Sequence, residues 1–184
     1  MSAQAAQGGK SAADIQIGIG RKEREQIATH LSKVLADTYM LYLKTHFYHW
    51  NVTGPLFASL HILLEKQYEQ LFDATDVLAE RIRALGFFAP GSISVFGSMT
   101  VIEDDKDNVP DAMQMIDNLV KGHEAISRTT RAAFKSAEDA EDQATMDLLV
   151  DRMRESDMAA WMLRSHLEKA SSEMLPRAVA AAAE

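Results

Sequence analysis

Four long stretches of this sequence repeat apolar residues at the spacing of an α-helix, and one of the gaps between them is much longer than the others. The stretches cover residues 21–50, residues 55–85, the segment from about residue 110, and the segment from about 139 to just before Pro176. Apolar residues three and four positions apart form one stripe along a helix. Each stretch therefore predicts a helix with one face to bury.

The gaps decide how these helices are connected. Gly54-Pro55 predicts a tight turn between the first and second helices, and the third and fourth helices are also closely joined. The long link from Phe87 to about Val109 holds Gly91 and Gly97, with one short turn of helix expected at Ser94–Phe96. A single long link must cross from one end of the bundle to the other. The prediction is an all-α fold, a ferritin-like four-helix bundle whose crossover lies between helices 2 and 3 and carries a short helix.

Three segments follow from this reading of the chain. Residues 1–20, rich in Ser, Ala, Gln and Gly, predict a flexible N-terminal arm. Residues 21–175 form the bundle, and residues 176–184 form a short C-terminal tail. No stretch is apolar enough to span a membrane or to act as a signal peptide. We expect a cytoplasmic protein without membrane contact, with nucleoid association as an open alternative.

Charge and cysteine content limit the chemistry. The chain has 27 acidic and 19 basic residues, a formal net charge of −8, which repels phosphate backbones and attracts cations. Cysteine is absent. Disulfides, iron–sulfur clusters and thiolate zinc sites are therefore excluded, and a metal has to be held by His, Asp or Glu.

The second helix has two distinct faces. At 100° per residue, one face gathers an apolar stripe: Leu60, Leu64, Leu71, Leu78 and Ile82. A different face gathers two aromatic residues and four potential metal ligands: His61, Glu65, Tyr68, Phe72, Asp76 and Glu80. A helix needs only one apolar stripe to fold into its own bundle. The second face is therefore expected to meet something else.

A second copy of the helix is the partner that fits. His61 and Glu80 lie about 28 Å apart along one straight helix, so they cannot share an ion within one chain. A two-fold axis pairs positions whose residue numbers have a constant sum, and the His61–Glu80 and Glu65–Asp76 pairs have the same sum. Two antiparallel copies would thus form two equal sites, each with His61 and Glu65 from one chain and Asp76 and Glu80 from the other.

His49 stands just before the turn into this helix and supplies a possible fifth ligand. Two imidazoles with three carboxylates suit iron, with manganese or zinc as competitors. Each pair taken alone has a simpler interpretation, because acids and His four residues apart occur on many solvated helix faces. The metal interpretation rests on the joint pattern.

These residues resemble the Dps family, the DNA-binding proteins from starved cells, also called mini-ferritins. The resemblance is carried by His49-Trp50-Asn51-Val52-Thr53-Gly54, by Phe57, His61 and Glu65, and by Asp76 to Gly86, and it extends over residues 21–173. It implies a dodecameric cage built from two-fold dimers, in which iron(II) is oxidised, usually with hydrogen peroxide, at di-iron ferroxidase centres between subunits. Ferric mineral is stored inside, which protects against oxidative damage.

The resemblance also implies roles for individual residues. His49, His61 and Glu65 would come from one chain and Asp76 and Glu80 from its partner. Glu65 departs from the family, where many members have Asp. Trp50 would lie near the centre and take up radical equivalents, while packing at an interface is its simpler role. His46, one turn before His49, is read either as an outer partner of the ligands or as packing. No role is assigned to His30, His123 or His166.

Two further expectations concern iron entry and DNA. The resemblance places an acidic three-fold pore near the start of the last helix, where this chain has Glu141, Asp142 and Asp147; charge compensation at a helix start is the alternative. A bundle-centred ferritin site is excluded, because it uses Glu-x-x-His, a pattern this sequence lacks. The remaining alternative is a DNA-compacting protein with secondary iron binding. DNA binding is doubtful, because the arm carries only Lys10 before Arg21.

Overall fold

A computed structural model describes residues 15–106 and 108–167 of the chain. Within this range the chain is helical, with no strand. The helices are α1 (Arg21–Asn51), α2 (Phe57–Ala84), α3 (Ile93–Met99), α4 (Ala112–Asp139) and α5 (Gln143–Arg164). Most of the predicted arm and the whole predicted tail lie outside the described residues.

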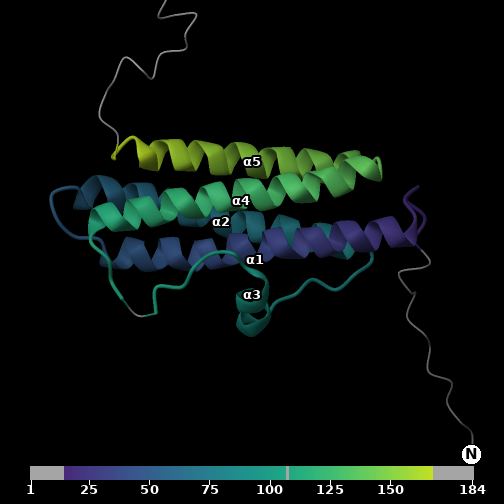
Figure 1. Cartoon of the computed structure of the whole chain (residues 1–184), viewed down its shortest axis with the longest axis horizontal. Coiled ribbons are helices and arrows are strands. Elements are labelled where there is room, and N and C mark those ends of the chain that lie inside the picture. Colours follow the sequence, from purple (N-terminus) through teal and green to yellow (C-terminus); the bar gives the residue numbers. More distant parts are fainter. Residues whose placement is uncertain (1–14, 107, 168–184) are drawn as a thin grey trace, which may run out of the picture.

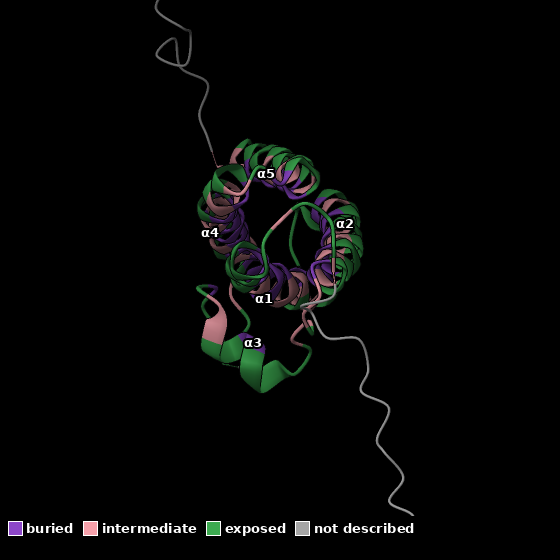
Figure 2. Cartoon of the chain, turned by 90° about the vertical axis from the view of Figure 1, so that its right-hand side faces the viewer, coloured by how far each residue is buried: buried purple, intermediate pink, exposed green. Residues whose placement is uncertain are grey.

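The four long helices form the predicted bundle with one crossover. Seen end-on, α1 lies beside α2 and α4, and α5 lies beside the same two helices (Figure 2). The link from α2 runs back along the outside of α1, where α3 packs, before α4 begins (Figure 1). As a result α2 and α4 run in the same direction, which a simple up-down-up-down bundle does not allow.

The leucine stripe of α2 faces the bundle core as predicted. Its five members, Leu60, Leu64, Leu71, Leu78 and Ile82, are each at most 1% exposed. Burying one such side chain contributes roughly 2 kcal/mol relative to leaving it in water. The stripe therefore fixes how α2 is rotated, and with it the direction in which the opposite face points.

Buried side chains also fix the ends of α2 and α3. Gly86, at a φ of 97°, follows α2 in the left-handed conformation that commonly ends a helix. The guanidinium of Arg24 on α1 donates to the carbonyl of Leu85 at 2.7 Å. Asp37 on α1 accepts hydrogen bonds from the Thr100 hydroxyl and the Val101 amide, both at 2.8 Å, and so holds the chain after α3.

The fourth long helix is shorter than the sequence suggested. The apolar pattern carried it to just before Pro176, but α5 ends at Arg164 and residues 165–167 form a turn. The Ser165 hydroxyl donates to the carbonyl of Trp161, and the Nδ1 of His166 lies 3.1 Å from the carbonyl oxygen of Met162. Such bonds from side chains compete with the backbone and favour helix ends.

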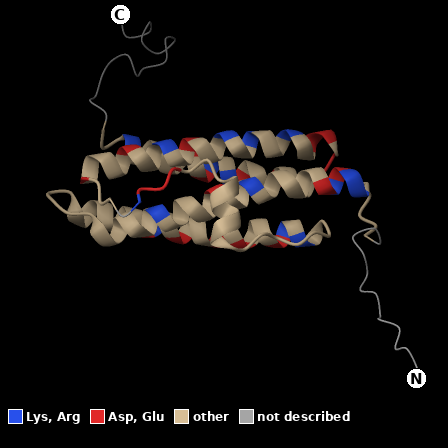
Figure 3. Cartoon of the chain, turned by 60° about the horizontal axis from the view of Figure 1, so that its bottom comes forward, with Lys and Arg blue, Asp and Glu red and all other residues tan. Residues whose placement is uncertain are grey.

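Asp142 caps the start of α5 and joins it to α2. Its carboxylate accepts from the Thr145 amide at 3.1 Å and from the Arg81 guanidinium at 2.6 and 2.8 Å (Figure 3 shows the charges of both helices). Burial opposes ionisation of this group, but the hydrogen bonds from Arg81 and Thr145 outweigh it and lower the pKa of Asp142 below its usual value.

We predict that Asp142→Asn lowers the melting temperature at pH 7 by roughly 5 °C, because the variant keeps a capping oxygen but leaves Arg81 unpaired. The pKa of Asp142 is lower in the folded chain than in the unfolded chain, where it is near 4. The ion pair therefore stabilises the fold fully above about pH 4, and this stabilisation is lost as the pH falls through the pKa of the folded chain. Thermal unfolding at fixed protein concentration should thus show a difference that shrinks below pH 4.

Asp147→Asn is the matched control, since Asp147 lies exposed on the same helix. If the Asp142→Asn protein had the same melting temperature as the wild type at pH 7, the ion pair would contribute nothing to stability.

Candidate metal centre

His49 and His61 face each other across the turn between α1 and α2. Their rings are stacked, with centroids 3.8 Å apart and an interplanar angle of 19°. The Nδ1 of His49 lies 2.9 Å from the carbonyl oxygen of His61, and the Nδ1 of His61 lies 3.0 Å from the carbonyl oxygen of His49. Each ring is thus held by the backbone of the other residue.

This reciprocal bonding selects the form in which both rings can bind a metal. A carbonyl oxygen only accepts, so each Nδ1 must carry the proton and donate it. In the uncharged form of such a ring, the Nε2 keeps its lone pair and can bind a metal. Metal-binding histidines usually show this arrangement, in which the second ring nitrogen is fixed by a carbonyl or carboxylate. The pair therefore fits a divalent metal that prefers nitrogen and oxygen ligands.

The carboxylates lie on the outer face of α2. Glu65, Asp76 and Glu80 are exposed, and Tyr68 is half-buried between the two ends of the set. Phe72, near its middle, is 55% exposed although its ring lies 5.6 Å from that of Tyr42, and so much exposure is unusual for an aromatic residue. This face is thus open for contact, as the two-face pattern predicted.

A single chain does not assemble the predicted ligands. Among the described residues, no three His, Asp or Glu side chains come close enough together to hold a metal ion. The structure brings His49 and His61 together at one end of α2, while Asp76 and Glu80 lie several turns along the helix. The described chain thus separates the predicted ligands into two groups, called half-sites below; that they bind metal and that a second copy completes them remain predictions.

Aromatic rings surround the histidine half-site. His46 stacks on Tyr68, with ring centroids 4.1 Å apart, and lies 4.2 Å from the ring of Trp50. Burial, and then the charge of nearby His49, lower the pKa of His46. Its ring lies 6.1 Å from that of His49. His46 therefore packs within this aromatic cluster, which agrees with one of its two predicted roles. Trp50 is 65% exposed at the edge of the cluster.

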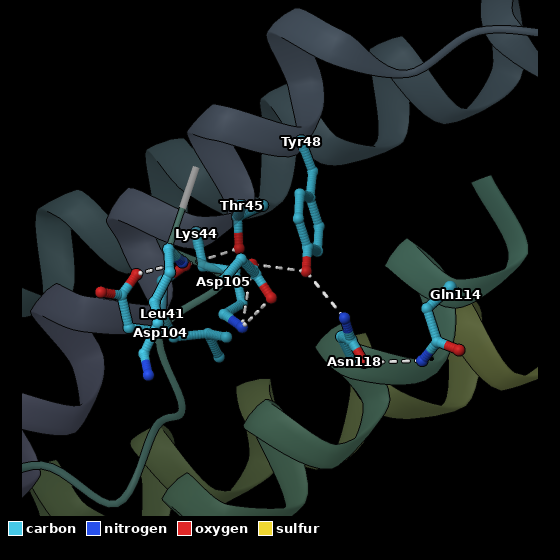
Figure 4. Close-up of polar contacts among 9 residues, drawn as sticks. Leu41, Lys44, Thr45, Tyr48, Asp104, Asp105, Gln114 and Asn118 are labelled. Atoms are coloured by element: carbon cyan, nitrogen blue, oxygen red, sulfur yellow. Dashed lines mark hydrogen bonds and ion pairs between the residues drawn. The ribbon is translucent and has the colours of Figure 1, made fainter. Parts of the chain in front are cut away.

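The sequence did not reveal what anchors the end of α1. The hydroxyl of Tyr48, a fully buried residue, donates to Asp105 at 2.7 Å and accepts from Asn118 at 2.8 Å (Figure 4). Lys44 pairs with the same Asp105 carboxylate at 3.1 Å. Burial is the main reason that the pKa of Tyr48 is raised above its usual value. The crossover link thereby holds the turn of α1 that carries His49.

The structure separates the three predicted pore residues. Glu141 and Asp147 are exposed near the start of α5. Asp142 is only 3% exposed, and Arg81 and Thr145 occupy its carboxylate. The capping alternative describes Asp142 better, and its carboxylate is not available to line a pore.

Comparisons with known proteins agree with this architecture. A family model for the ferritin-like domain matches residues 28–172. A low temperature-induced protein of uncharacterised function from Nostoc sp. is 41% identical over 84% of this chain and 87% of its own length. The DNA protection during starvation protein of Agrobacterium fabrum is 30% identical over 77% of this chain and 87% of its own length.

Solved structures show the same relationship. DpsC from Streptomyces coelicolor superposes with a TM-score of 0.83 at 28% identity, covering 91% of this chain and 98% of its own. The Dps protein of Vibrio cholerae O1, described as a member of a broad superfamily of ferritin-like diiron-carboxylate proteins, gives a TM-score of 0.81 at 29% identity, covering 87% and 100%. From its helices, its half-sites and these relatives, the chain belongs to the Dps family of mini-ferritins.

Proposed function

We propose that this protein oxidises iron(II) at sites shared between two subunits and stores the ferric product inside a dodecameric cage. The observation that carries the proposal is the locked pair His49 and His61, whose Nε2 atoms are left free to bind, on a helix that carries Asp76 and Glu80 on its exposed face. Neither the histidine pair nor the carboxylate pair has enough ligands to hold a metal firmly by itself. A second copy related by a two-fold axis would supply the missing ligands to both.

The contact needed for this pairing is present on α2. An axis between Gln70 and Leu71 would bring Tyr68 and Phe72 of both copies to the centre of the interface. Phe72 is the exposed apolar residue in this position, and covering it would contribute about 1–2 kcal/mol per copy. The same axis would set His61 and Glu65 opposite Glu80 and Asp76 of the second copy.

Each ligand has a distinct task in this site. The two imidazoles would bind the first iron(II), and Glu65, Asp76 and Glu80 would complete its coordination and that of a second iron. Negative carboxylates favour iron(III) over iron(II), so they promote oxidation. Two iron(II) ions each give one electron, and hydrogen peroxide, the proposed oxidant, takes both together with two protons to form two waters. Because the electrons leave as a pair, hydroxyl radical is not released.

The surroundings of the site would support this chemistry. Trp50 and Tyr68 pack on His46, close to the histidine half-site, and can take up a stray oxidising equivalent. Glu141 and Asp147 are exposed near the start of α5, where a three-fold ring of acids would draw cations inward. No helix of the described chain is long and apolar enough to cross a membrane. We place the protein in the cytoplasm.

We predict that two inactive variants restore activity to each other when they assemble together. One variant carries His49→Ala and His61→Ala, and the other carries Asp76→Asn and Glu80→Gln. In a mixed dimer one site loses both halves and the other keeps both. Random mixing makes half of the dimers mixed, with one of two sites intact, so about a quarter of wild-type oxidation is expected. Iron(II) oxidation after joint unfolding and refolding measures it.

Two controls make the result specific. A variant with Glu138→Gln and Asp139→Asn removes two exposed acids of α4, away from the proposed interface on α2, and should keep its activity. Each inactive variant refolded alone should oxidise iron at least about 100-fold more slowly than the wild type. No recovery on mixing, with cages of normal mass, would contradict a site shared between subunits.

DNA binding is the second candidate function, because several relatives are named for DNA protection during starvation. The net charge of −8 opposes it, and a cage would multiply that charge. We predict no retardation of plasmid DNA in a gel shift at about 150 mM salt, where phosphate contacts are screened. Retardation that disappears when residues 1–20 are removed would establish DNA binding through the arm.

A further inference from the structure

The apolar core of the bundle is divided into two parts by a polar layer. One cluster of buried apolar residues surrounds Leu41, Leu71 and Ile126, and the other surrounds Leu35 and Leu78. Between them each long helix contributes a buried hydroxyl. These residues, called the waist below, are Thr38 of α1, Thr75 of α2, Thr130 of α4 and Ser156 of α5.

The waist is unequally satisfied. Thr38 and Thr75 donate to carbonyls of their own helices, those of Val34 and Phe72. The hydroxyls of Thr130 and Ser156 have no partner among the described residues. The same is true of the Oε1 of Gln67, both ring nitrogens of His123 and the Nε of Arg152, which also have no hydrogen-bond partner among the described residues. All five residues are at least 95% buried.

One hydrogen bond joins α2 to α5 in this part of the bundle. The amide nitrogen of Gln67 lies 3.4 Å from the carbonyl oxygen of Ala159, less than one turn beyond Ser156. Burial, and then the charge of Arg152, lower the pKa of His123 to about 3, which favours the neutral imidazole. The Nη1 of Arg152 lies 3.2 Å from Glu155 but without hydrogen-bond geometry.

The chemistry of the group identifies its ligand. A metal ion would be repelled by Arg152 and would find a single imidazole and no carboxylate among the unpaired groups. An anion would match the guanidinium and the hydroxyls, but it could not satisfy the Gln67 oxygen or the lone pair of His123, which need a donor. Water both donates and accepts, and buried water typically makes about three hydrogen bonds to such groups.

A groove lies beside this layer. It has a volume of about 370 Å³ and opens between α2 and α5, and Arg152 lies in its wall beside Gln70, Asp147 and Asp151. Arg152 is 4% exposed and lies one turn before Ser156 on α5, so the groove and the waist are adjacent along this helix. We propose that the waist is a binding site for water and other small hydroxylic molecules, hydrogen peroxide included, which enter the bundle through this groove.

A crystal structure of the wild-type protein at about 1.5 Å resolution tests the site directly. We expect ordered water within hydrogen-bonding distance of His123 and of Ser156 or Thr130. A dry layer, in which these side chains have turned to bond with one another, would overturn the proposal.

Access can be tested by chemistry, because the chain has no cysteine. Ser156→Cys introduces a single thiol in the waist, and Ala133→Cys introduces one in the apolar cluster, where Ala133 is 1% exposed. Hydrogen peroxide converts a thiol to sulfenic acid and water, and dimedone traps the acid with a mass gain that methionine oxidation does not give. The protein is used free of iron, because iron(II) would itself react with the hydrogen peroxide.

We expect the waist thiol to react at least about tenfold faster than the control thiol, since peroxide reaches the control only when the bundle opens locally. Equal rates would show that the waist is closed to solvent and would contradict the route through the groove. Neither measurement requires the metal centre, so the outcome is independent of the proposed iron chemistry.

Discussion

The central constraint on this fold is that α2 buries one face in the bundle core and exposes a second face that carries carboxylates. Its leucine stripe is almost fully buried and fixes the rotation of the helix within the bundle. That rotation turns the face with Glu65, Asp76 and Glu80 outward. Because the two faces are parts of one rigid helix, the core of the subunit positions groups that it never touches.

The histidine half-site shows how a loop can prepare ligands. The turn at Gly54, at a φ of 97°, reverses the chain so that the end of α1 and the start of α2 lie side by side. His49 and His61 then bind each other's carbonyl groups, and the network of Tyr48, Asp105 and Asn118 holds α1 from the other side. In the proposed metal centre the imidazoles would therefore be oriented before a metal binds, which would reduce the entropy lost on binding.

The sequence predicted the features that depend on local periodicity. The helices, the leucine stripe and the crossover follow from residues a few positions apart. It could not predict pairs formed by distant residues. Asp105 belongs to an acidic run that resembles a solvated link, yet its partners lie 57 and 61 positions away on α1. The family resemblance grouped Asp142 with Glu141 and Asp147 in an acidic pore, although Arg81, 61 positions away, holds Asp142 in the interior.

The waist and the proposed metal centre both contain polar groups that one folded chain does not fully pair. The waist lacks hydrogen-bond partners, and the proposed centre lacks the ligands of a second copy. An unpartnered buried donor or acceptor costs about 1–3 kcal/mol, so a dry waist with several of them would remove much of the stability of an ordinary domain. Water can meet this cost inside the bundle, because it both donates and accepts hydrogen bonds. The carboxylates of α2 are different, since solvent already hydrates them. Bringing them together requires a second chain and a cation to offset their repulsion, so metal binding to the proposed centre should stabilise the subunit pair that forms it.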